Sequence, residues 1–232
     1  MFFWNPTYFV FALPALLLAM WAQSRVRGAY SKFMRVPSRR GISGAQAAQE
    51  LLRSRGLGQV TVEGARGQLT DHYDPRRKKL HLSQGVAQSS SIAALSIVAH
   101  EVGHAVQDST NYGPLKLRSG IVPMVQLSAA VGPIIFFLGF MMQSMGVAWL
   151  GVILFSASAL FALVTLPVER NASKRALQML TTTGLIVGQQ EESAARQVLE
   201  AASWTYVAAL VQVLSTLLYY VFLLSGSSRR RR

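Results

Sequence analysis

The chain contains no cysteine among its 232 residues. This absence excludes disulfide bonds and thiolate ligands, so any bound zinc would have to be held by histidine and carboxylate side chains. Acidic residues are also few, since ten Asp and Glu stand against 23 Lys and Arg, and histidine occurs only four times. A metal site in this chain must therefore be built from a small set of residues.

Charged residues are absent from the long runs 1–24, 119–168 and 201–228. A formal net charge of +13 would ordinarily suggest a nucleic-acid partner. Here the apolar residues are concentrated in the uncharged runs, a pattern that indicates a membrane protein. We therefore expect the lipid bilayer, and not nucleic acid, to be the partner of this chain.

The uncharged runs predict about four transmembrane helices, because one span takes about 20 apolar residues. The first run holds one span, and the middle run holds two, at about 121–141 and 148–166, with a tight turn near 144–146. The last span lies at about 202–224 and is followed by an arginine tail, which together form region 201–232.

The first run, 1–24, predicts an uncleaved anchor, because it lacks the basic start and the A-x-A-like cleavage site of a signal peptide. Six positive charges follow it: Arg25, Arg27, Lys32, Arg35, Arg39 and Arg40. By the positive-inside rule, residues 25–118 would then lie in the cytoplasm. The arginine tail would lie on the other side, against the rule, but the larger charge excess decides the orientation.

Residues 25–118 form the largest polar region. Ser43 is a suitable N-cap for a short helix at 42–55 that Gly56 ends. Residues 59–63 and 79–83 alternate like strands and predict a pair of strands before the next helix. An edge strand there could pair with an extended peptide substrate, as in many proteases. The alternative is a plain supporting hairpin.

The centre of this region is the H-E-x-x-H pattern of His100, Glu101 and His104, within a predicted helix at 91–108. Residues four apart share a helix face, so the two imidazoles can bind one zinc ion. Glu101 would face the same cleft and act as general base. Gly103 costs about 1 kcal/mol against Ala in a helix, which indicates that another element approaches closely there. The alternative is a purely structural His-Glu pair.

A catalytic zinc site requires a third protein ligand. Glu169 opens the polar segment 169–200 directly after a predicted span, where an unpaired charge is costly. A glutamate that merely begins a helix is the rival interpretation. Other carboxylates stay open as ligands: Glu50, Glu63, Asp71, Asp74, Asp108, Glu191, Glu192 and Glu200.

Five segments, in this order, resemble the YugP-type membrane zinc metallopeptidases, a glutamate-zincin-like group of neutral zinc metallopeptidases. They are DHYDP at 71–75, HLS at 81–83, AHEVGHAVQ at 99–107, YGPLKLRS at 112–119 and LPVERNASKRAL at 166–177. The likeness covers nearly the whole chain. Residues 169–173 also resemble the E-x-x-x-D segment that supplies the third ligand of glutamate zincins, which favours Glu169.

The resemblance implies a zinc peptidase of the bacterial plasma membrane, with His100 and His104 as zinc ligands and Glu101 as general base. One position departs from the wider group, because Ser173 stands where an Asp usually orients a ligand histidine. A hydroxyl, or one of the carboxylates Asp71 and Asp108, would then take this task.

The oxyanion that develops during peptide hydrolysis needs a hydrogen-bond donor in addition to the metal. His72 and Tyr73 are the favoured candidates, because DHYDP precedes the strand expected at the edge. Tyr112 and Asn171 are further candidates.

Together these features predict a mainly α multi-pass membrane protein with a small α+β zincin-like metalloprotease domain. We expect a zinc-dependent endopeptidase that cleaves membrane-associated proteins or peptides through Glu-assisted attack of zinc-bound water. Because Glu169 lies two residues after Pro167, the site would lie at the membrane surface. The main alternative is a non-catalytic membrane scaffold that retains a metal site; a basic module for anionic lipid is a third.

Overall fold

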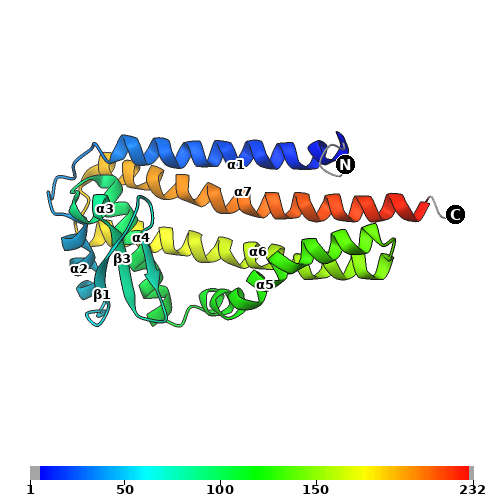
Figure 1. The fold of residues 1–232 in the computed structure, drawn as a ribbon. Helices are drawn as coiled ribbons and strands as arrows, with labels where there is room; N and C mark the ends of the chain where they lie inside the picture. Colours follow the sequence, from blue (N-terminus) through cyan, green and yellow to red (C-terminus); the bar gives the residue numbers. More distant parts are fainter. Residues whose placement is uncertain (1–5, 230–232) are drawn as a thin grey trace. The chain divides into compact units, whose positions relative to one another are not determined.

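The computed structural model describes residues 6–229, which fold into long helices and one small sheet (Figure 1). The start of the predicted anchor 1–24 and the end of the arginine tail lie outside the described residues. The elements are α1 (Pro6–Phe33), α2 (Gly44–Ser54), β1 (Thr61–Ala65), β2 (His72–Asp74), β3 (Lys79–Ser83), α3 (Gln84–Gln88), α4 (Ile92–Ser109), α5 (Gly113–Met141), α6 (Met145–Thr182) and α7 (Gly188–Arg229).

The chain divides into two compact units. The membrane unit comprises Met1–Ala22, Leu117–Leu166 and Thr205–Arg232, and the polar unit comprises Gln23–Lys116 and Pro167–Trp204. Four described helices, α1, α5, α6 and α7, are long and apolar enough to cross a membrane. The expected fold class, a multi-pass helical membrane protein with a small α+β part, is therefore confirmed.

Within the membrane unit, α5 and α6 form the predicted hairpin and pack with almost no space between their backbones. A β-carbon at Gly151 of α6 would lie 2.2 Å from the backbone nitrogen of Phe136 in α5. The ring of Phe136 in α5 stacks on the ring of Tyr220 in α7, with 4.0 Å between the centroids. Small residues allow such close approach of helices in lipid, where dispersion contacts supply much of the attraction.

Most of the polar segment 169–200 belongs to two long helices that also contain apolar runs. Pro167 lies inside α6, so the helix neither ends nor restarts there. Residues 169–182 are the end of α6, and residues 188–200 are the beginning of α7. A proline can stay inside a helix when neighbouring groups satisfy the freed carbonyl.

The sheet of the polar unit differs from the predicted strand pair. Its order is β1-β3-β2; β1 pairs parallel to β3, and β2 pairs antiparallel to β3. Residues 79–83 therefore form the central strand and not an edge, and the edge beside them is the three-residue strand β2, which the sequence analysis did not predict. The three residues of β2 are too few to show an alternating pattern. The parallel pair β1 and β3 requires a crossover connection between the strands, which a hairpin does not have.

Helix α4 lies at the centre of the polar unit, and the predicted helix at 91–108 is confirmed within one residue. The hydroxyl of Ser91 accepts a hydrogen bond from the backbone nitrogen of Ala94 and caps the helix start. The side chains of Leu95, Val98 and Val102 are completely buried in the core. Helix α2 packs beside it and is closed by a capping box of Ser43 and Gln46. These contacts hold the H-E-x-x-H residues on a rigid helix.

Candidate metal centre

The close approach predicted at Gly103 is made by α6. A β-carbon added to Gly103 would lie 2.8 Å from the carbonyl oxygen of Ala172. Ala172 stands three residues after Glu169, about one helical turn. The missing side chain at Gly103 thus lets α6 come near enough to α4 for Glu169 to reach both histidines.

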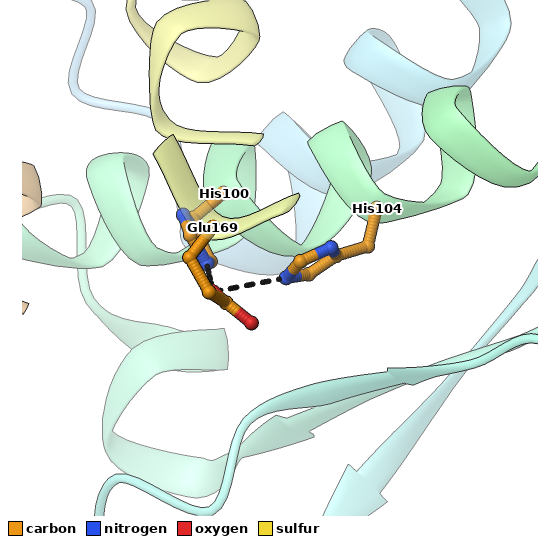
Figure 2. A group of neighbouring side chains, drawn as sticks. All are labelled: His100, His104 and Glu169. Carbon is orange, nitrogen blue, oxygen red and sulfur yellow. Dashed lines mark hydrogen bonds and ion pairs between the residues drawn. The ribbon is translucent and has the colours of Figure 1, made fainter. Parts of the chain in front are cut away.

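The three predicted metal ligands come together at this crossing. In Figure 2, the imidazoles of His100 and His104 from α4 both face the carboxylate of Glu169 from α6. The Nε2 atoms of the two histidines lie 3.1 and 3.5 Å from one oxygen, Oε2 of Glu169. One ligand atom from each residue lies within 4.8 Å of the others. Glu169 is only 2 % exposed, so its charge requires a partner at this place.

The outer nitrogen of each imidazole has a polar partner. The hydroxyl oxygen of Ser173 lies 3.2 Å from Nδ1 of His100, and Oε1 of Gln107 lies 2.9 Å from Nδ1 of His104. The Ser173 hydroxyl thus contacts a histidine of the cluster, as considered from the sequence. Gln107, which contacts the other histidine, was not among the predicted residues. Its position three residues after His104, on the same helix face, was the available signal.

The two carboxylates considered for this task lie elsewhere. Asp108 accepts hydrogen bonds from Tyr73 and Lys78. Asp71 accepts from the backbone nitrogen and the hydroxyl of Ser83. Among the described residues, the Nδ1 atoms of His100 and His104 contact a hydroxyl and an amide oxygen, so the interpretation of Asp71 and Asp108 as histidine-orienting groups is corrected.

The donor set fits zinc. Two imidazole nitrogens and one carboxylate oxygen are ligands that zinc prefers, and three protein ligands are typical of catalytic sites. With Nδ1 of each ring engaged by an oxygen atom, the Nε2 atoms face a carboxylate oxygen. Nitrogen lone pairs and a carboxylate oxygen would repel one another unless a proton or a cation lay between them, so the cluster is suited to hold a cation.

Glu101 lies beside this cluster and is held by the edge strand. The backbone nitrogen of Tyr73 in β2 donates a hydrogen bond of 3.0 Å to Oε2 of Glu101. Burial raises the pKa of the Glu101 carboxyl, and the neighbouring imidazoles of His100 and His104 act against this rise. A partly buried carboxylate with a raised pKa is a suitable proton acceptor and donor near neutral pH.

The side chains of the two favoured oxyanion candidates have their contacts outside the cluster. The hydroxyl of Tyr73 donates to Oδ2 of Asp108 over 2.7 Å. The ring of His72 stacks on His81, with 4.6 Å between the centroids, and its Nδ1 lies 2.8 Å from the Thr70 carbonyl oxygen. The structure brings the backbone of Tyr73, and neither of these two side chains, to the H-E-x-x-H residues.

Comparison with known proteins identifies the family of this chain. Residues 8–225 match the family described as "Putative neutral zinc metallopeptidase". The chain is 44% identical, over 216 residues, to "Putative membrane protease YugP" of Bacillus subtilis, covering 93% of this chain and 96% of that protein. No solved structure matches. With four helices able to cross a membrane and a His-His-Glu cluster beside a partly buried glutamate, this chain belongs to the family of neutral zinc metallopeptidases.

Proposed function

We propose that this chain is a membrane-embedded, zinc-dependent endopeptidase in which His100, His104 and Glu169 hold the metal and Glu101 is the general base. The observation that carries the proposal is the convergence of both Nε2 atoms on one oxygen of Glu169. When bound, zinc lowers the pKa of a water molecule and polarises the scissile carbonyl.

Glu101 would move the protons of the reaction. One of its oxygens accepts the Tyr73 N–H, and the other can take a proton from the attacking water. The water oxygen then forms a bond to the carbonyl carbon. When the carbon–nitrogen bond breaks, Glu101 returns the proton to the leaving amine. The atoms balance, because one water molecule is consumed and its two hydrogens end on the new carboxyl and amine groups.

Strand β2 is suited to hold the peptide backbone. It is an edge strand with β3 on its other side, and the N–H of Tyr73 points away from β3 toward Glu101. An extended substrate could therefore add to this edge beside the base, as in other cases of strand addition. As donor to the oxyanion we propose Tyr73 or His72, whose side chains have other partners in this structure and would have to turn toward the cluster when a substrate binds.

The proposed substrates are membrane proteins, their segments near the bilayer, or membrane-bound peptides. Glu169 follows the uncharged run 119–168 directly in the sequence, which at about 1.5 Å per helical residue leaves little distance to the apolar region. The positive charges after the first span favour a cytoplasmic active domain in the plasma membrane. Proteolysis that is equally fast with and without lipid would contradict the proposed substrate class.

The test is metal content and turnover of the purified protein in detergent. We expect about one zinc per chain in the wild type, as the donor set implies, and its loss in His104→Ala and in Glu169→Ala. Glu101→Gln should keep zinc and the fold but lose cleavage of a quenched fluorescent peptide library. Zinc absent from the wild type, after purification without chelator, would overturn the enzyme proposal and favour the scaffold.

A further inference from the structure

Gln107 is a completely buried polar residue on α4, one turn beyond His104. We propose that Gln107 is a positioning residue that fixes His104 in the tautomer whose Nε2 lone pair faces the metal site. The inference rests on the proposed function, because it assigns a role toward the same zinc ion.

The orientation of the Gln107 amide is determined by two neighbouring oxygen atoms that act only as hydrogen-bond acceptors. Its Nε2 lies 2.8 Å from the carbonyl oxygen of Val168, which can only accept. The same Nε2 lies 3.0 Å from Oδ1 of Asn171, and that oxygen also accepts from Nε of Arg175 over 2.7 Å. Since a guanidinium can only donate, the Asn171 amide is oriented as well. Both amides can therefore be assigned from their partners.

The oriented amide leaves Oε1 of Gln107 facing His104, 2.9 Å from Nδ1. An amide oxygen accepts and does not donate, so Nδ1 must carry the proton. In the neutral imidazole, Nε2 is then the nitrogen with the free lone pair, and it is the atom that faces Glu169 at 3.5 Å. The hydrogen bonds that begin at Arg175 and Val168 thus determine which nitrogen of His104 is available for a metal.

The support of the other histidine is different. Nδ1 of His100 lies 3.2 Å from the hydroxyl of Ser173, and a hydroxyl can rotate to donate or to accept. Ser173 therefore stabilises either tautomer of His100, whereas Gln107 permits one tautomer of His104. This asymmetry makes Gln107 the group that selects the metal-binding form.

The same amide also holds the backbone beside the third ligand. Val168, whose carbonyl accepts from Gln107, directly precedes Glu169 in α6. The amide oxygen of Gln107 accepts a hydrogen bond from His104, and its amide nitrogen donates to the backbone of α6. These two tasks can be separated, because a Glu side chain would keep the acceptor and lose the donor.

The experiment compares Gln107→Met and Gln107→Glu, with Ser96→Ala as control. Ser96 is buried on the same helix and its hydroxyl bonds the backbone oxygen of Ile92, so its loss reports a structural change without touching the metal ligands. Zinc affinity is measured by competition with a chelator, and thermal unfolding of the metal-free proteins is recorded separately.

Loss of the acceptor in Gln107→Met should weaken zinc binding about 10- to 100-fold, the usual effect of removing a partner of a ligand histidine. Gln107→Glu should retain an affinity within a few-fold of the wild type, although both variants lose the bonds to α6. Equal losses of affinity in the two variants, or wild-type affinity in Gln107→Met, would overturn the inference. A wild type that binds no zinc would instead overturn the proposed function.

A measurement on the wild type keeps the inference testable if the variants fold poorly. The chain has four histidines, so selective ¹⁵N labelling gives few imidazole signals, and His104→Ala identifies those of His104. In the zinc-loaded protein we expect a protonated Nδ1 and a metal-shifted Nε2 for His104. A zinc-loaded protein in which His104 carries its proton on Nε2 would overturn the assignment.

Discussion

Gly103 of α4 lies against the backbone of Ala172 of α6, and a β-carbon at Gly103 would be 2.8 Å from the Ala172 carbonyl oxygen. A methyl group there must push the two helices apart, because backbone atoms cannot rotate away. This contact, rather than any property of the histidines themselves, sets the distance from His100 and His104 to Glu169.

The variant Gly103→Ala should therefore lose zinc affinity and stability together. Overpacking of this kind costs about 1–3 kcal/mol, more than the ~1 kcal/mol that Ala gains over Gly in a helix. Metal content and the midpoint of thermal unfolding give the result. Gly28→Ala in α1 is the matched control, since a β-carbon there meets nothing within 4 Å. An unchanged zinc affinity in Gly103→Ala would contradict the role of this contact.

Tyr73 holds α4 at two points, through its backbone N–H on Glu101 and its hydroxyl on Asp108. Glu101 and Asp108 are seven residues apart, or about two turns, on one helix face. Tyr73→Phe and Asp108→Asn should each weaken this attachment and lower turnover by a similar factor while zinc content is retained. The double variant should lose little more than Tyr73→Phe alone, because without the Tyr73 hydroxyl the change at Asp108 no longer acts on this hydrogen bond.

The same variants test the oxyanion role proposed for Tyr73. A donor to the oxyanion contributes about 10²- to 10³-fold in turnover, whereas the attachment to α4 involves one hydrogen bond to a charged group, about 1.5–3 kcal/mol in stability. A loss of turnover in Tyr73→Phe that far exceeds the loss in Asp108→Asn would favour the oxyanion role.

The metal-free protein should lose stability as the pH rises through neutrality. Burial lowers the pKa of His104, but its hydrogen bond to Glu169 and the charges of Glu101 and Glu169 raise the pKa above the ordinary 6.5. A pKa raised in the folded state stabilises the protein below the unfolded pKa, and this contribution disappears as the pH rises through the folded pKa. Thermal unfolding between about pH 6 and about pH 9, a window that starts near the ordinary histidine pKa, should show this fall.

Zinc should reverse this trend, because its ligands bind it in their deprotonated forms and a proton is released. The zinc-loaded protein should thus be stabilised increasingly as the pH rises over the same window. His104→Ala serves as the control and should show neither effect. A metal-free wild type whose unfolding midpoint rises with pH would show that the imidazole is not stabilised in its charged form.

The hairpin of α5 and α6 depends on Gly151. Its β-carbon position lies 2.2 Å from the backbone nitrogen of Phe136, so Gly151→Ala must separate the helices. We expect a loss of about 1–3 kcal/mol, seen as faster thermal unfolding in detergent. Gly146→Ala, on the same helix with nothing within 4 Å, should behave like the wild type. Equal stability of both variants would contradict the close packing.

Features that repeat over short distances were predictable from the sequence. The H-E-x-x-H helix and the membrane helices follow from apolar periodicity and charge, which act within one element. The place of Glu169 in the His-His-Glu cluster was predictable because a lone carboxylate after an apolar run is costly without a partner. The resemblance of residues 169–173 to a zincin segment supported the same choice.

Only the tertiary structure decided which groups meet across elements. The partners of the outer imidazole nitrogens, Ser173 and Gln107, and the contact of Tyr73 with Glu101 depend on how α4, α6 and β2 pack. The bond from Ser173 to His100 joins residues 73 apart in the sequence. The three residues of β2 carry too little pattern to reveal a strand, and their place at the sheet edge comes from pairing with β3. Local periodicity thus determined the helices and the residue types of the candidate site, whereas long-range packing and hydrogen bonding determined the geometry that brings these residues together.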